Sequence, residues 1–332
     1  MLSMNTYPTS TVFMLAPQRH GSNKTQSMLS ANNPHLFGPY PPVIRQKFQQ
    51  LESHLGSNLL EAMVHNANLS PRPLMTSGKP LTPASVRSEL AARQLPENAL
   101  GISLALCHLG AKASGFSSYR VLCKSPDNLG VVEAHHAEFR DTAYLHLIRD
   151  PRAVWNSGRG TPRGPQTPHA AALKWADYHA RVHALAGTIP IITLTYEQLM
   201  LHPETELQRA CRFLDIPFSE DMLEGHGSAD ARKAASTNPG LWGNLAKPIL
   251  HSRIDAWKQE LPSEEIDIIE NTCAEVMEAY GYAPLFPSRQ LTEAEKGFKP
   301  IVKGKAPTGE PRKAQLEHLT QWSSALGANS AA

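Results

Sequence analysis

Apolar positions along the chain alternate between short continuous runs and longer stretches with helical spacing. The short runs predict buried parallel strands at 11–15, 119–124, 144–148 and 189–196. Helical spacing predicts helices at 43–65, 85–110 (in two pieces broken near Leu95-Pro96), 151–157, 169–185, 197–201, 203–214, 252–260 and 262–280. Strands that alternate with helices are typical of an α/β fold with a parallel sheet.

Segments rich in Pro, Gly or polar residues separate these elements. Four prolines in 32–42 predict a rigid extended loop, and 70–83 predicts an irregular crossing. The stretch 225–250 has little periodicity and predicts a long loop, which is uncommon unless it is functional or disordered. Two helices between the first two strands form a large insertion, and such insertions commonly line a substrate site.

The composition predicts a folded protein and excludes several function classes. The 332 residues are 41% hydrophobic with a net charge of +2, so neither disorder nor nucleic-acid binding is indicated. The sequence has no 18-residue apolar run and no secretion signal, so we expect no membrane partner. Four scattered cysteines without CxxC spacing favour a reducing cytoplasmic location, and the absence of clustered ligand residues favours no metal.

The segment 11–31 has the pattern of a phosphate cradle. The strand 11–15 leads into a polar turn with Gly21, and a helix is expected to begin near Asn23 or Lys24. A helix start offers free N–H groups and a positive dipole end to an anion, to which Arg19, Lys24, Ser22 and Thr25 add donors. A Walker A loop would have Gly before the Lys-Thr pair, where this chain has Asn23. A solvated turn between strand and helix is the alternative.

A second basic segment follows a later strand. The run 144–148 leads into Arg149-Asp150-Pro151, where Asp150 suits a helix N-cap and Pro151 the first helical turn. Ser157 lies eight residues after Arg149, so both could reach one ligand. Lys124 ends another predicted strand, at the sheet edge where ligands bind in open α/β folds.

Four segments together resemble the PAPS-dependent sulfotransferases, closest in motif to the tyrosylprotein and bacterial polyketide-associated branches. PAPS is 3′-phosphoadenosine-5′-phosphosulfate. Residues 17–25 (PQRHGSNKT) resemble the 5′-phosphosulfate loop, with His20 in place of a small residue, and 144–157 (YLHLIRDPRAVWNS) resembles the 3′-phosphate motif. Residues 195–203 (TYEQLMLHP) resemble the family's Y-E-x-L…P segment, and 235–257 the late cofactor-covering loop.

The resemblance implies an α/β fold with a P-loop-like central parallel sheet flanked by helices and a helical insertion over the substrate side. The expected organisation is an N-terminal extension at 1–10, a single sulfotransferase-like domain at 11–285 with the insertion 43–118 as an acceptor-side cap, and a basic, mobile tail at 286–332. In that tail we expect one short helix near 315–326.

The implied reaction transfers a sulfuryl group from PAPS to a hydroxyl of a small acceptor. Phe37, Tyr40 and Phe48 on the acceptor side favour an apolar or aromatic compound. The implied cofactor-binding residues are Arg19, His20, Gly21, Ser22, Asn23, Lys24, Thr25, Arg149, Ser157, Tyr196 and Lys247. The implied catalytic residues are Arg19, His20, Lys124 and Ser236. The oligomeric state is left open, with a homodimer among the options.

The general base departs from the family pattern. The slot that holds Glu in the related branches falls on Pro39, Tyr40 or Pro41, and the slot that holds His in the cytosolic branch falls on Pro126. His20 ranks first as a substitute because it lies in the cradle, and His54, His65 and Asp127 follow. The missing carboxylate keeps open the alternative of an inactive nucleotide-binding scaffold. A P-loop small-molecule kinase is a further alternative, disfavoured by Asn23 before Lys24 and because Asp150 is the only plausible Mg²⁺ ligand at a strand end.

Overall fold

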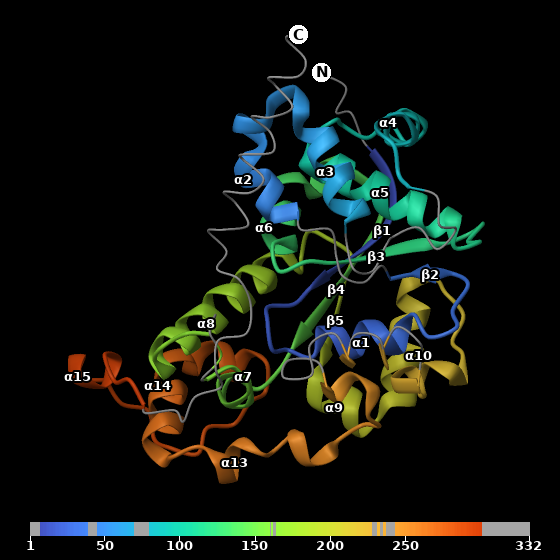
Figure 1. Ribbon diagram of the computed structural model, residues 1–332. Coiled ribbons are helices and arrows are strands. Elements are labelled where there is room, and N and C mark those ends of the chain that lie inside the picture. Colours follow the sequence, from blue (N-terminus) through green and yellow to red (C-terminus); the bar gives the residue numbers. More distant parts are fainter. Residues whose placement is uncertain are drawn as a thin grey trace. The chain divides into compact units, whose positions relative to one another are not determined.

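The computed structural model describes residues 7–38, 45–69, 80–159, 161, 164–227, 231–232, 235–236 and 243–300 (Figure 1). The expectations for the start of the chain, the prolines at 39–42, most of the 70–83 crossing and the tail helix near 315–326 lie outside these residues.

A five-stranded parallel sheet forms the centre of the fold. The sequence predicts a parallel sheet and four of its strands, but the short strand at Leu36–Phe37 lies in the stretch 32–42 that was expected to be a loop. The strands are β1 (Tyr7–Leu15), β2 (Leu36–Phe37), β3 (Arg120–Lys124), β4 (Phe139–Ile148) and β5 (Ile191–Thr195), in the order β2-β3-β1-β4-β5. Leu36 pairs with Arg120 in the parallel β2–β3 ladder, and Tyr144 with Ile191 in the parallel β4–β5 ladder. Residues 12–15 of β1 are fully buried, as expected for a strand covered on both faces.

The chain divides into two compact units. Within the described residues it passes between them inside β1, between Asn32 and Asn33, and inside β4. The first unit holds Asn33–Ala143 with the start of β1. Its helices are α2 (Arg45–Leu55), α3 (Leu59–Asn68), α4 (Pro83–Ala92), α5 (Ala99–Ala113) and α6 (Asn128–His135), with 3-10 turns at Gly56–Asn58 and His136–Glu138. The largely buried α5 packs against α2, α3 and α4.

One continuous helix over 43–65 is a wrong expectation. The helix stops at Leu55, and Gly56 adopts a left-handed φ of 48° before α3 begins. Gly, Ser and Asn follow one another at 56–58, and all three are poor residues for a helix interior. The two-piece expectation for 85–110 is confirmed by α4 and α5.

Among the described residues, the second unit holds Met14–Asn32 and 144–300. Its helices are α1 (Ser22–Leu29), α7 (Pro151–Gly158), α8 (Pro168–Leu185), α9 (Tyr196–Leu201), α10 (Pro203–Leu214), α13 (Trp257–Glu260), α14 (Ser263–Ala279) and α15 (Glu293–Lys296). The 3-10 turns are Glu220–Met222, Gly225–Gly227, Gly243–Ala246 and His251–Arg253. The expected helix over 252–260 is wrong in its first half, because α-helix begins only at Trp257.

Helix α14 lies along α8 in this unit (Figure 1). Their facing sides form an apolar cluster around three buried tryptophans, Trp155, Trp175 and Trp257. This packing fixes α8 on the unit that carries the ends of β4 and β5. No helix within the described ranges has the length and apolar character that a membrane crossing requires.

Candidate functional site

The turn between β1 and α1 has the predicted geometry of an anion cradle. Gly21 is the N-cap of α1 with a left-handed φ of 88°, and Arg19 is also left-handed at 72°. The first hydrogen bond of the helix runs from the Thr25 N–H to the Gly21 carbonyl, at 3.0 Å. The N–H groups of the residues between them have no acceptor within the helix, so they present the positive end of α1 to its surroundings.

Tyr196 explains why position 21 is glycine. A Cβ at Gly21 would lie 2.4 Å from Cδ2 of the Tyr196 ring, a distance that side chains do not tolerate. The same ring also meets Arg149, whose guanidinium carbon lies 4.2 Å from the ring centroid. Tyr196, the first residue of α9, thus packs against both basic segments of the second unit.

Arg149 is held at the carboxyl end of β4 with one donor nitrogen unused. Its Nη1 donates to the Arg19 carbonyl at 3.2 Å and its Nη2 to the Arg253 carbonyl at 3.0 Å. The Nε atom is buried and has no hydrogen-bond partner among the described residues. The backbone is fixed as well, because the Trp175 indole donates to the Arg149 carbonyl at 2.9 Å.

Arg19 and Ser157 are brought together. The Arg19 Nε and Nη2 atoms donate to the Ser157 hydroxyl at 3.1 and 2.8 Å. Ser157 lies near the end of α7, whose start is capped as predicted by Asp150, which accepts from the Arg152 N–H at 2.8 Å. Burial and the nearby Arg149 charge lower the pKa of Arg19 from its usual value.

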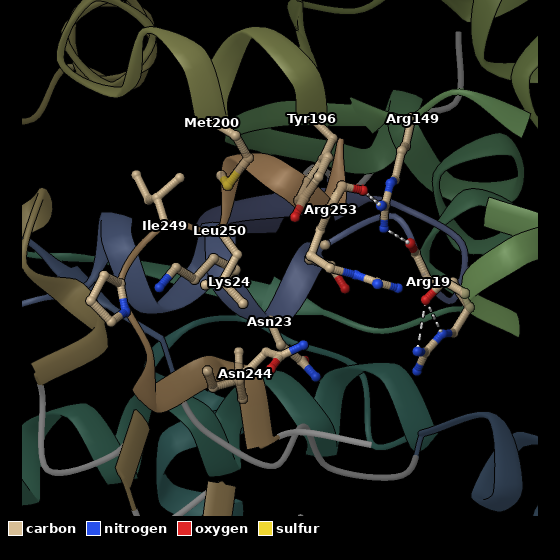
Figure 2. Close-up of a pocket in the computed structure, with 15 residues that line it drawn as sticks. Arg19, Asn23, Lys24, Arg149, Tyr196, Met200, Asn244, Ile249, Leu250 and Arg253 are labelled. Carbon is tan, nitrogen blue, oxygen red and sulfur yellow. Dashed lines mark hydrogen bonds between the residues drawn. The ribbon is translucent and has the colours of Figure 1, made fainter. Parts of the chain in front are cut away.

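These residues line one pocket of the second unit (Figure 2). Its lining comprises Arg19, Gly21, Ser22, Asn23, Lys24, Arg149, Ser157, Tyr196, Met200, Asn244, Leu245, Pro248, Ile249, Leu250 and Arg253. Figure 2 shows the three arginines on one side and the apolar Met200, Ile249 and Leu250 on the other. Four lining residues are cationic, and the described lining includes no carboxylate.

Lys24 belongs to this pocket through α1. Its Nζ donates to the Lys247 carbonyl at 2.8 Å. Burial lowers the pKa of Lys24 to about 8, although the Glu224 charge opposes the shift. Lys24 is therefore mostly charged at pH 7 and titrates only slightly above it.

Five of the residues expected from the sequence lie elsewhere. His20 and Thr25 are buried behind the turn, and the Thr25 hydroxyl donates to the Gly21 carbonyl at 3.3 Å. Lys247 is exposed and meets the pocket through its carbonyl, and Ser236 is an exposed helical residue. Lys124 ends β3 in the first unit. The roles assigned to these five side chains stay predictions.

The sequence analysis did not single out several residues that line the pocket, including Met200, Asn244, Leu250 and Arg253. Asn244 and Leu250 lie in the long aperiodic stretch 225–250, for which the sequence offered only its length and the resemblance of 235–257 to a cofactor-covering loop. Among the described residues, no group of three or more His, Cys, Asp or Glu side chains is placed to hold a metal ion. The expectation that no metal is needed stays a prediction.

Solved sulfotransferase domains share this architecture. The sulfotransferase domain of an olefin synthase from Synechococcus PCC 7002 matches with a TM-score of 0.61 and 21% identity, covering 84% of this chain and 96% of that domain. The sulfotransferase domain from the curacin biosynthetic pathway matches with a TM-score of 0.53 and 19% identity, covering 84% of this chain and 99% of that domain. At these identities the likeness shows the fold.

Sequence comparison identifies the family. Protein-tyrosine sulfotransferase A from Caenorhabditis elegans is 26% identical over 157 residues, which is 44% of this chain and 40% of the relative. The match thus spans less than half of that relative's length. A model of the sulfotransferase family matches residues 11–220, and a sulfotransferase domain model matches residues 169–281. The chain belongs to the sulfotransferase family.

Proposed function

We propose that the chain transfers a sulfuryl group from PAPS to a hydroxyl of a small apolar or aromatic acceptor and releases 3′-phosphoadenosine 5′-phosphate. The observation that carries the proposal is that two basic segments, Arg19–Lys24 after β1 and Arg149 after β4, line one pocket. PAPS carries anionic groups at both its 5′ and 3′ positions, so it would engage both segments at once. Membership of the sulfotransferase family supports the same reaction class.

The charges of the pocket fit such a ligand. Arg19, Lys24, Arg149 and Arg253 supply four cations, and the described lining supplies no acid to neutralise them. The buried Arg149 Nε has a hydrogen to donate and, within the described part of the chain, no acceptor for it. A buried donor without a partner costs free energy, and a phosphate oxygen would remove that cost.

Different residues of the lining would hold three parts of the nucleotide. The start of α1, together with Arg19, would hold the 5′-phosphosulfate, where free N–H groups and the helix dipole favour negative charge. Arg149 and Ser157 would hold the 3′-phosphate. The apolar side formed by Met200, Ile249 and Leu250 would contact the adenosine.

The electrostatics also suit the chemical step. PAPS supplies an activated sulfuryl group, whose sulfur–oxygen bond to the 5′-phosphate breaks as a bond to the acceptor oxygen forms. Negative charge then grows on the 5′-phosphate. Arg19 and Lys24 would stabilise that charge, an effect that usually contributes most to such catalysis. Lys124 and Ser236 are proposed for the same role from the sequence.

The acceptor class and the base are proposed from the sequence. Phe48 is fully buried, and Phe37 meets Phe116 edge to face with ring centroids 5.3 Å apart, so both serve the packing of the first unit. The proposal of an apolar or aromatic acceptor therefore depends on the composition of the insertion. The acceptor's proton needs a base. The sequence ranks His20 first for this role, but its ring is 1% exposed and its Nε2 atom lies 3.0 Å from the His179 Nε2 atom, so the base is left open here.

A kinase is disfavoured by Asp150. This residue was the one plausible Mg²⁺ ligand at a strand end, but its two carboxylate oxygens receive hydrogen bonds from Arg152, at 2.9 Å from Nε and 2.7 Å from Nη2. Asn23 also stands where a Walker A loop has Gly. An inactive nucleotide-binding scaffold is the remaining alternative, and it shares the pocket with the proposed enzyme.

A thermal-shift series with 3′-phosphoadenosine 5′-phosphate, adenosine 5′-phosphosulfate and Mg-ATP tests the nucleotide. A ligand at a hundred times its Kd stabilises the folded state by about 2.7 kcal/mol. We expect the largest stabilisation with 3′-phosphoadenosine 5′-phosphate. Stabilisation by Mg-ATP without any by the phosphoadenosine would overturn the proposal.

A further inference from the structure

Three buried histidines form a chain behind the pocket. His20 lies in the cradle turn, His146 in β4 and His179 in α8, and each is at most 1% exposed. The Nε2 atoms of His20 and His179 are 3.0 Å apart, and the His179 Nδ1 atom is 2.8 Å from the His146 Nε2 atom. Segments distant in the sequence are thereby linked through imidazole rings alone.

The Gln18 end of the histidine chain assigns a tautomer to every ring when all three are neutral. The His20 Nδ1 atom lies 3.0 Å from the Gln18 carbonyl, which can only accept, so Nδ1 carries the hydrogen. In a neutral ring the His20 Nε2 atom must then accept, so His179 donates from Nε2 and accepts at Nδ1. His146 consequently donates from Nε2, and its Nδ1 accepts from the Thr193 hydroxyl at 3.1 Å.

The surroundings favour neutral rings. Trp175, Tyr178 and Tyr280 face the histidines with ring centroids 4.8 to 6.0 Å away. Burial lowers the pKa of His20 to about 4 and that of His146 to about 3. The positive charge of Arg149 contributes to lowering the pKa of His20. With the tautomers as assigned, a proton added to His20 or His179 would place two donors opposite each other, so this arrangement of hydrogens belongs to neutral rings.

The chain of three histidines begins in the cradle turn, at a residue that lies between two left-handed backbone positions. His20 lies between Arg19 and Gly21, both with left-handed φ, a conformation that costs a residue other than glycine about 1 kcal/mol or more. Such a turn persists when its surroundings hold it. Trp175, one turn before His179 on α8, holds the carbonyl of Arg149. One face of α8 therefore fixes both basic segments.

We propose that His179 is a positioning residue, which holds His20 and so keeps the Arg19–Gly21 turn in the conformation that presents Arg19 and the start of α1 to the nucleotide. This inference rests on the proposed function of the pocket. Within the chain, the lone pair of the His20 Nε2 atom is used by His179. The positioning role and a proton-accepting role for His20 therefore exclude each other in this conformation.

The tautomers are testable without any ligand. Nitrogen-15 NMR of histidine-labelled protein at pH 7 should show three neutral rings, with hydrogen on Nδ1 of His20 and on Nε2 of His146 and His179. The single substitutions of these histidines assign the signals. A charged ring, or hydrogen on Nε2 of His20, would contradict the proposed hydrogen-bond arrangement of the three histidines, whether or not the pocket binds nucleotide.

Two substitutions of His179 test its effect on the pocket. His179→Leu removes the donor to His20 and should weaken binding of 3′-phosphoadenosine 5′-phosphate about tenfold, the consequence of one unsatisfied buried acceptor. His179→Gln retains an N–H group at the Nε2 position and should stay within about threefold of wild type. His183→Leu, an exposed position on the same helix, is the control. Equal, unchanged affinities for the Leu and Gln variants would overturn the proposal.

His20→Leu separates the two roles of His20. Positioning predicts that nucleotide affinity and turnover fall together. A base predicts that turnover falls by roughly 10²–10⁴-fold with affinity unchanged, and that outcome would overturn the positioning role. If the wild-type protein binds no phosphoadenosine, the proposed function fails. The tautomers measured by NMR still test the hydrogen-bonded chain of three histidines.

Discussion

The Arg149 guanidinium lies over the Tyr196 ring, and the ring packs on Gly21 so closely that a methyl group there would lie 2.4 Å from it. The end of β4, the start of α9 and the cradle turn are therefore fixed to one another through a single aromatic side chain. A cation over an aromatic ring contributes about 0.5–2 kcal/mol, more where water is excluded. Tyr196 is thus a shared support for both phosphate-binding segments of the proposed site.

Arg149→Ala should weaken binding of 3′-phosphoadenosine 5′-phosphate by about 1.5–3 kcal/mol, the usual contribution of a charged hydrogen-bond donor. Adenosine 5′-phosphosulfate, which has no 3′-phosphate, should lose much less affinity. Isothermal titration calorimetry with both nucleotides measures the difference. Arg181→Ala, an exposed arginine paired with Asp177 on α8, is the control. Equal losses for the two nucleotides would mean that Arg149 does not contact the 3′-phosphate.

Gly21→Ala should weaken nucleotide binding by at least about tenfold, because the new methyl group must displace the Tyr196 ring and the turn needs a left-handed φ. Gly187→Ala provides the control, since a Cβ there meets no atom within 4 Å. Both variants are compared by titration with 3′-phosphoadenosine 5′-phosphate. Wild-type affinity in Gly21→Ala would show that the close contact with Tyr196 is dispensable.

Because Lys24 titrates near neutral pH, we expect nucleotide binding to depend on pH. Its pKa of about 8 in the free protein rises when an anion binds, so binding is strongest below pH 8 and weakens as the pH rises above it. Affinity measured from pH 7 to 9.5 should therefore fall for wild type. Lys24→Gln should bind more weakly at pH 7 but show a flatter profile. Parallel profiles for the two proteins would remove Lys24 from the ligand's surroundings.

The histidine chain predicts acid sensitivity. A histidine whose pKa is lowered by folding contributes stability that is present above its unfolded pKa of about 6.5 and is lost as the pH falls towards its folded value. His20 and His146, at about 4 and 3, each contribute a slope of about 1.4 kcal/mol per pH unit near pH 5. Urea unfolding at pH 7 and pH 5 should give a smaller pH difference for His146→Asn than for wild type. Identical differences would contradict neutral burial of His146.

The sequence predicted the parts of the site that lie next to regular elements. Arg19 and Lys24 follow the apolar run of β1, and Arg149 follows that of β4, so strand periodicity alone placed them at one edge of the sheet. Asp150 and Pro151 marked the start of α7 through local capping chemistry, which needs no tertiary information. Ser157 was predicted from its position eight residues after Arg149, along that helix.

The remainder depends on contacts between distant segments. Asn244 and Leu250 line the pocket from a stretch without helical or strand period, where no local pattern indicates the direction of a side chain. His20, His146 and His179 are separated by up to 159 residues, so only the packing of α8 on the sheet reveals that they touch. The sequence correctly placed His20 in the cradle turn but could not show that its ring faces the interior.

Transfer of radiolabelled sulfuryl from PAPS to a panel of phenols, aliphatic alcohols and carbohydrates tests the central claim most directly. The account predicts a sulfated product from a phenol or apolar alcohol, formed in equal amount with 3′-phosphoadenosine 5′-phosphate, and loss of both in Arg19→Ala. Tight binding of 3′-phosphoadenosine 5′-phosphate without transfer to any acceptor in the panel would contradict the enzyme and favour the scaffold.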